Sequence, residues 1–232
     1  MTARDGGGGT GGTGGTGGGN GPERIRRVVT GHDARGRAVV VTDEEVEPVT
    51  LSLLPGFETI ELWHTTATPS MPDDLGSPGV PDYFPAPGGT VFRVVTFPPD
   101  PRGGRGEAGT TGAGAGAAAG GAGTTGAADA GAADAGAVPV PDVAAALEEA
   151  QRKVPALMAR LEPDHPGMHT TDSVDYAIVL DGELELELDD GALVPVRPGT
   201  VVVQRGTRHA WRNRTDRAAR IAFVLVGARP AG

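Results

Sequence analysis

The feature that most constrains the fold is a strict alternation of charged and apolar residues at positions 183–188, which carry the sequence ELELEL. An extended strand directs successive side chains to opposite faces, so the three leucines share one face and the glutamates share the other. Such a strand is buried on one side only. It is followed by Asp189, Asp190 and Gly191, which are typical of a hairpin turn. This part of the chain is therefore expected to form antiparallel β-structure.

Similar short runs of β-branched and aromatic residues recur along the chain, separated by turn residues at the close spacing of an antiparallel barrel. We expect strands at residues 37–42, 58–64, 90–97, 177–180, 193–196, 200–203 and 220–226. One helix is expected from an Asp142 N-cap to about Leu161, because its apolar residues form one stripe, which should pack on the barrel. Pro155 should kink or break this helix. The predicted fold class is all-β, an antiparallel jelly-roll β-barrel with extra N-terminal strands.

Two segments are too poor in large apolar side chains to join a core. The chain has 232 residues, of which 39 are glycine. Burial in such glycine-rich segments cannot offset the backbone entropy lost on ordering, so we expect them to be disordered. The predicted organisation is a disordered arm at 1–22, N-terminal strands joining the barrel at 23–102, a flexible Ala/Gly-rich insertion at 103–140, the helix at 141–162, and the barrel core carrying the site at 163–232.

The net charge and the cysteine content limit the possible binding partners and the residue types that could form a functional site. The formal net charge of −10 argues against a nucleic acid partner, because a phosphate-binding face needs a basic excess. The chain has no cysteine, so any site must use histidine, carboxylate, hydroxyl or amide groups. This composition suits a cytoplasmic protein. No signal pattern and no apolar run of about 20 residues is present, so neither secretion nor a membrane partner is expected.

Candidate metal ligands lie on either side of the ELELEL hairpin. His169, Thr171 and Asp175 have the same parity, so their side chains point to the same face if the segment is extended. His209 belongs to a later strand. Two imidazoles and one carboxylate would form a facial triad for a divalent first-row metal ion, with positions left open for water or substrate. We therefore predict His169, Asp175 and His209 as metal ligands.

These residues lie in segments that resemble the two motifs of the cupin superfamily. His169, Asp175 and Gly182 resemble the first motif, G(X)5HXH(X)3–4E(X)6G, and GTVVVQRGTRHAWRN at 199–213 resembles the second, G(X)5PXG(X)2H(X)3N. The flanking sequences resemble a mostly uncharacterised subgroup of small single-domain cupins from bacteria and fungi. The resemblance covers the last third of the chain best, and it implies a small RmlC-like barrel that binds an iron, manganese, nickel or zinc ion.

Several positions depart from the motifs. Thr171 occupies the slot of the second histidine, Asp175 that of the glutamate, and Gln204 that of the second motif's proline. A hydroxyl is a poor ligand for a borderline ion, so His165 is a candidate replacement ligand, while Asp175 has a second interpretation as the group that orients His169. Thr171, Gln204 and Trp211 are further candidates for the pocket. Alternatively, the two site histidines are hydrogen-bonded core residues of a barrel that binds an organic ligand without metal.

The sequence leaves two functions open. One is a metal-dependent enzyme acting on a small organic molecule, and the resemblance admits a dioxygenase, decarboxylase, isomerase or dehydratase. The other is a non-catalytic small-molecule-binding or sensory cupin without metal. The apolar residues Tyr176, Ile178 and Leu180 predict a homodimer unless the N-terminal strands cover them.

Overall fold

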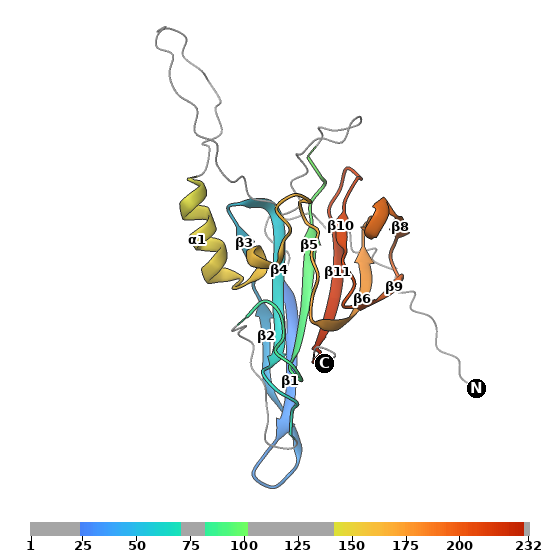
Figure 1. Ribbon diagram of the computed structural model, residues 1–232. Helices are drawn as coiled ribbons and strands as arrows, with labels where there is room; N and C mark the ends of the chain where they lie inside the picture. Colours follow the sequence, from blue (N-terminus) through green and yellow to red (C-terminus); the bar gives the residue numbers. More distant parts are fainter. Residues whose placement is uncertain (1–23, 71–81, 102–141, 230–232) are drawn as a thin grey trace, which may run out of the picture.

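The computed structural model describes residues 24–70, 82–101 and 142–229, and the protein is mainly antiparallel β-structure (Figure 1). The strands are β1 (Ile25–His32), β2 (Ala38–Val46), β3 (Val49–Leu51), β4 (Leu54–Thr65), β5 (Thr90–Phe97), β6 (Ser173–Asp181), β7 (Leu184–Glu187), β8 (Leu193–Val196), β9 (Val201–Arg205), β10 (Ala210–Arg212) and β11 (Ala219–Gly227). The helices are α1 (Val143–Lys153) and α2 (Leu157–Arg160), and a short 3-10 turn spans Asp189–Gly191. The predicted all-β class is confirmed. The expected arm at 1–22 and insertion at 103–140 lie outside the described residues.

Two sheets enclose the main core. The larger has the strand order β3-β4-β5-β11-β6-β9, and the smaller has the order β10-β7-β8. Every pairing within them is antiparallel. The N-terminal strands β3, β4 and β5 thus continue the sheet formed by the C-terminal strands. Strand β5 pairs directly with β11 along its whole length, which places residues from the two halves of the chain on one inner surface.

The alternation in the sequence determines which side chains form this inner surface. Ala177 and Val179 of β6, Ile221 and Phe223 of β11, and Leu184 and Leu186 of β7 are buried in one cluster. Leu188 packs against the same cluster, so the three leucines of the ELELEL segment face the interior, as their parity indicates. Burying a side chain of this size contributes about 1.5–3 kcal/mol, and this cluster therefore holds the two sheets together.

The predicted helix is divided in two. Asp142 caps α1, because its carboxylate accepts hydrogen bonds from the backbone N–H groups of Ala144 and Ala145. The helix ends before Pro155, and Ala156 has a positive φ of 63° at the start of α2. Ala150, Val154 and Leu157 pack on Leu51, Leu54 and Tyr83, so the apolar stripe contacts the β3–β4 end of the large sheet (Figure 1).

Strands β1 and β2 form a separate two-stranded sheet, and the turn of this hairpin projects from the rest of the molecule (Figure 1). The prediction of a strand at 37–42 corresponds to the first part of β2, but this strand does not hydrogen-bond to the large sheet. Ile25 and Val46, at the base of the hairpin, pack on a cluster formed by Ile60, Leu62 and Val94. The N-terminal strands therefore reach the large sheet partly by pairing and partly by packing.

The outer face of β6 is exposed. Tyr176, Ile178 and Leu180 have exposed fractions of 51, 41 and 43 %, so the described N-terminal strands do not cover them. The homodimer stays a prediction, which the molecular mass in solution tests. Among the described residues, neither helix is long and apolar enough to span a lipid bilayer.

Candidate functional site

A cavity of about 420 Å³ lies against the inner surface of the large sheet. Residues of β4, β5, β6, β10 and β11 contribute to its wall, together with α2 and the loops at 82–84, 98–101 and 161–169. Both halves of the chain thus build it. The lining residues are Leu53, Leu54, Pro55, Phe57, Tyr83, Phe84, Arg93, Val95, Phe97, Pro98, Pro99, Asp100, Pro101, Leu157, Leu161, Gly167, His169, Thr171, Asp175, His209, Trp211, Asn213, Phe223 and Leu225.

His169 and His209, which are forty positions apart, meet at this cavity. Their backbones form an isolated antiparallel bridge, in which the N–H of each residue donates to the carbonyl of the other at 3.0 and 2.9 Å. The bridge places the two imidazoles side by side, with 4.3 Å between the ring centroids. His209 is 2 % exposed and His169 is half-buried. The structure therefore brings together the two histidines selected from the motifs.

Both imidazoles are oriented by the carbonyl two residues earlier. Nδ1 of His169 lies 3.0 Å from the Gly167 carbonyl oxygen, and Nδ1 of His209 lies 2.9 Å from that of Thr207. A carbonyl oxygen only accepts hydrogen bonds, so each Nδ1 is the protonated nitrogen and donates. The lone pair of each neutral imidazole is consequently on Nε2.

Burial keeps both imidazoles neutral. Burial and, to a smaller extent, the neighbouring His169 together lower the pKa of His209 to about 4, against the raising effect of the Thr207 carbonyl. Burial also lowers the pKa of His169, although the Gly167 carbonyl opposes the shift. Neutral imidazole is the form that binds a metal ion or accepts a proton.

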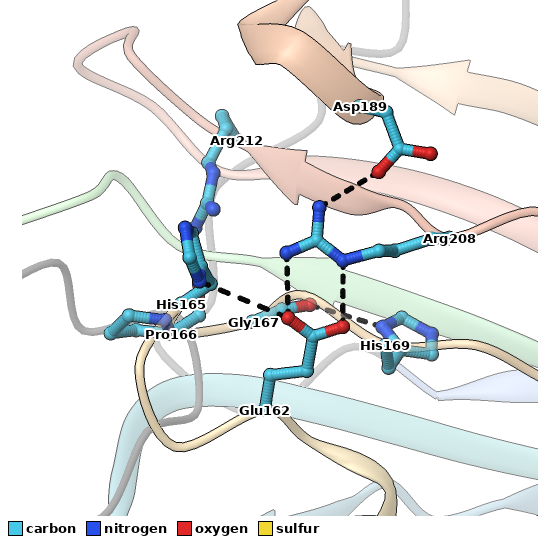
Figure 2. Close-up of polar contacts among 8 residues, drawn as sticks. All are labelled: Glu162, His165, Pro166, Gly167, His169, Asp189, Arg208 and Arg212. Carbon is cyan, nitrogen blue, oxygen red and sulfur yellow. Dashed lines mark hydrogen bonds and ion pairs between the residues drawn. The ribbon is translucent and has the colours of Figure 1, made fainter.

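A network of arginine contacts fixes the loop that carries the Gly167 carbonyl (Figure 2). Arg208 donates two hydrogen bonds to Glu162, at 2.7 and 2.6 Å, and a third to Asp189 at 2.9 Å. Arg212 donates to the Pro166 carbonyl at 2.6 Å. The hydrogen bonds from Arg208 also hold the pKa of Glu162 below its ordinary value. Both ends of the loop are therefore tied to the segment that carries His209.

Thr171, Asp175 and Gln204, three buried candidates for the site, each take part in a hydrogen bond within the protein. The Asp175 carboxylate accepts a 2.5 Å hydrogen bond from the Ser173 hydroxyl and a 3.5 Å contact from Thr171. Burial raises the pKa of Asp175 above its ordinary value. Gln204 lies opposite Asp175 in the β6–β9 pairing; its Oε1 accepts from Thr207, while its buried Nε2 has no hydrogen-bond partner among the described residues.

Whether a metal ion fits the site depends on how many of these imidazole and carboxylate groups lie close together. No three or more His, Asp or Glu side chains within residues 24–70, 82–101 and 142–229 are grouped closely enough to share an ion. His165 does not fill the gap, because its side chain is 61 % exposed and lies 3.9 Å from Glu162 (Figure 2). Two imidazoles are in place, whereas a three-ligand set is not formed. The assignment of Asp175 as third ligand stays a prediction.

Several wall residues were not identified from the sequence. Trp211 was expected at the pocket and lines it, but Tyr83, Phe84, Arg93 and Phe97 come from the N-terminal half. Arg93 is 2 % exposed; it pairs with Glu61 at 3.2 Å and lies 3.5 Å above the Tyr83 ring. The sequence TVFRVVTF at 90–97 could have indicated that Arg93 is buried, because in a strand Arg93 shares a face with Val91 and Val95. A charged residue on the apolar face of a strand indicates a buried polar site.

These observations define an antiparallel jelly-roll protein with a cavity lined by histidine and aromatic residues. Residues 157–226 match the family model described as "Cupin domain", so this part of the chain is a cupin domain and the resemblance of the motifs is confirmed.

Curated relatives match part of this chain. The chain is 52% identical over 64 residues to "Phomopsin biosynthesis cluster protein C'" of Diaporthe leptostromiformis, covering 27% of this chain and 34% of that protein. It is 41% identical over 66 residues to "Cupin-domain-containing oxidoreductase virC" of Hypocrea virens, covering 27% and 34% of the two chains. The matches thus span about one third of the length of these relatives. Among solved structures, the Schizosaccharomyces pombe Cnp3 cupin domain aligns with 87% of each chain, at 9% identity and a TM-score of 0.38.

Proposed function

We propose that the cavity binds a small, largely apolar organic molecule whose polar end contacts His169 and His209. The volume of about 420 Å³ lies in the range of small-molecule pockets. Such pockets combine apolar walls with a few polar groups that fix the orientation of the ligand. The observation that carries the proposal is the position of the two neutral imidazoles on the wall of an otherwise mainly apolar cavity.

An enzymatic role extends this proposal. Relatives from Hypocrea virens and Aspergillus ruber, which match 27% and 30% of this chain, are named cupin-domain-containing oxidoreductases. His169 and His209 are the groups placed to accept a proton from a bound molecule, because each has its lone pair on Nε2. The alternative, a cupin that binds its ligand without catalysis, uses the same two groups as hydrogen-bond acceptors.

Occlusion of the cavity tests whether it is the binding site. Leu161 is half-buried in the wall, so Leu161→Trp should fill part of the space, whereas Leu193→Trp makes the same change at an exposed position of β8. Calorimetric titration with 2-naphthol and decahydro-2-naphthol should show binding of at least one probe to the unmodified chain. Leu161→Trp should weaken it at least tenfold, and Leu193→Trp should not. Equal affinities in the two variants, both folded by circular dichroism, would contradict the proposal.

A divalent metal ion at the histidine pair is the second candidate. It is favoured by the hydrogen bonds of both Nδ1 atoms to carbonyl oxygens, because metal-binding histidines are commonly oriented in this way. The ion would act as a Lewis acid toward an oxygen of the bound molecule. Against it stands the carboxylate of Asp175, which is hydrogen-bonded to Ser173 and not grouped with the imidazoles.

Elemental analysis separates the two candidates. Chelator-rinsed protein is reconstituted with iron, manganese, nickel or zinc and compared with His169→Ala and His209→Ala. Stoichiometric metal that is lost in both variants would support the metal site. Full occupancy in the His209→Ala variant, or no binding by the unmodified chain after reconstitution, would remove this candidate and leave the metal-free pocket.

A further inference from the structure

Aromatic side chains are concentrated around the cavity. The chain has five Phe, two Tyr and two Trp residues, and six of these nine line the cavity. Their rings also contact one another and the histidines in a continuous series. It runs from Phe84 through His169, His209 and Trp211 to Phe97 and Phe57, with centroid separations between 4.3 and 6.3 Å.

The geometry of these contacts favours a flat ligand. Most of the rings meet edge to face or at a tilt, which leaves aromatic faces and edges available to a further ring in the cavity. An added aromatic ring makes the same offset or edge-to-face contacts, whereas a saturated ring of the same shape offers only dispersion and burial. The wall therefore discriminates between ligands of equal apolar area.

The polar end of the cavity offers acceptors. Each Nδ1 donates to its own carbonyl, so each Nε2 of the neutral pair can only accept a hydrogen bond. Neither Nε2 has a hydrogen-bond partner within the part of the chain that the structure describes. Of the donors nearby, Asn213 donates to two carbonyls. Arg93 donates to the Tyr83 carbonyl and forms an ion pair with Glu61, and its buried Nε has no hydrogen-bond partner among the described residues.

We infer that the ligand is a hydroxylated aromatic molecule, whose ring system lies among the aromatic side chains and whose O–H group donates to Nε2 of His169 or His209. This inference rests on the proposed binding function and specifies its ligand class. A carboxylate or a ketone would bring a second acceptor to an imidazole that cannot donate. The volume is sufficient, because a cavity of about 150 Å³ holds one benzene ring, so about 420 Å³ accommodates two or three fused rings.

A matched series of probes tests both parts of the inference on the full chain. We expect 2-naphthol to bind about tenfold more tightly than decahydro-2-naphthol, because only the former makes ring–ring contacts. We also expect 2-naphthol to bind about tenfold more tightly than 2-methoxynaphthalene, which keeps the rings but cannot donate. The anion 2-naphthoate should bind more weakly than 2-naphthol.

Two substitutions locate the preference. Phe84→Leu should reduce the preference for 2-naphthol over the saturated probe, because Phe84 lines the cavity and contacts His169. Phe92→Leu is the matched control, since Phe92 is 40 % exposed and does not line the cavity. Either His169→Phe or His209→Phe, according to which imidazole accepts the hydrogen bond, should remove the preference for 2-naphthol over 2-methoxynaphthalene. If a variant does not fold, the probe series on the unmodified chain decides.

Each outcome has a distinct meaning. Equal binding of the saturated and aromatic probes, or tighter binding of 2-methoxynaphthalene, would overturn the inference and leave the binding function intact. Tighter binding of 2-naphthoate would also overturn it and would indicate Arg93 as the anchoring group. No binding of any probe at millimolar concentration would contradict the binding function and the inference together.

Discussion

Replacement of Gly182 by alanine should destabilise the protein far more than the same change at Gly191. Both residues have a positive φ, 73° and 70°, in the left-handed region that L-residues avoid. A Cβ at Gly182 would lie 2.6 Å from both Cα and Cβ of Ala219 and 2.7 Å from the carbonyl oxygen of Ala218. A Cβ at Gly191 would meet no atom within 4 Å. The two sites therefore share the backbone strain and differ only in the steric clash.

The magnitudes follow from these two contributions. The left-handed conformation costs an L-residue roughly 1–2 kcal/mol, which applies at both positions. The clash adds about 1–3 kcal/mol at Gly182 alone, because two of its contacts are to main-chain atoms that cannot rotate away. Gly182→Ala should thus lower the free energy of unfolding by about 2–5 kcal/mol, and Gly191→Ala by about 1–2 kcal/mol.

Urea unfolding followed by circular dichroism measures both values. With a slope of about 1–3 kcal/mol per molar urea, the midpoint of Gly182→Ala should fall by about 0.7 M or more. The midpoint of Gly191→Ala should move by about half as much or less. If the two variants lose equal stability, the close approach of the β6–β7 turn to Ala219 is not a constraint, and the reasoning is refuted.

Three further predictions concern the site. The pKa of His209 is about 4 in the folded protein and about 6.5 in the unfolded chain, so unfolding takes up a proton between these pH values. In urea titrations, the unmodified chain should therefore be about 2 kcal/mol less stable at pH 5 than at pH 7. His209→Gln should lose less stability over the same pH range. Asn213→Ala should lower stability by about 2–4 kcal/mol in the same assay, because buried Asn213 links the Phe97 and Arg217 carbonyls, and a loss below 0.5 kcal/mol would contradict this role. Arg208→Gln should speed amide hydrogen exchange in the loop at 162–168, because it removes the two hydrogen bonds to Glu162. Arg208→Lys should restore protection only in part, because lysine cannot form the bidentate contact. Unchanged exchange in Arg208→Gln would contradict the role of Arg208 in fixing this loop.

Much of the fold was predictable because its signals are local. The alternation at 183–188 predicted which faces of β7 are buried, and the turn residues predicted the ends of β5 and β8. Strands β1 and β3 were not predicted, and no range was predicted for β10. Strand β1 contains Arg26 and Arg27, which pair across the hairpin with Asp43 and Glu44. Charge pairing between strands is not visible from one segment alone.

The site was predictable only in part, for a similar reason. Motif spacing identified His169 and His209, and parity placed Thr171 and Asp175 on the inner face. The aromatic wall was missed because Phe84 and Phe97 are more than seventy residues from the histidines in the sequence. Their position depends on the register of β5 against β11, in which Phe97 lies opposite Ala219. A register between distant strands is a property of the folded sheet.

The histidine pair does not depend on the positions at which the motif varies. Each imidazole is oriented by the carbonyl two residues before it, and the pair is joined by its own backbone bridge. Thr171 and Asp175 instead contact each other and Ser173. Main-chain groups are present whatever the side chains are, so threonine can occupy the slot of the second histidine without disturbing the first. The orientation of the pair therefore depends on main-chain groups and not on the side chains at positions 171 and 175.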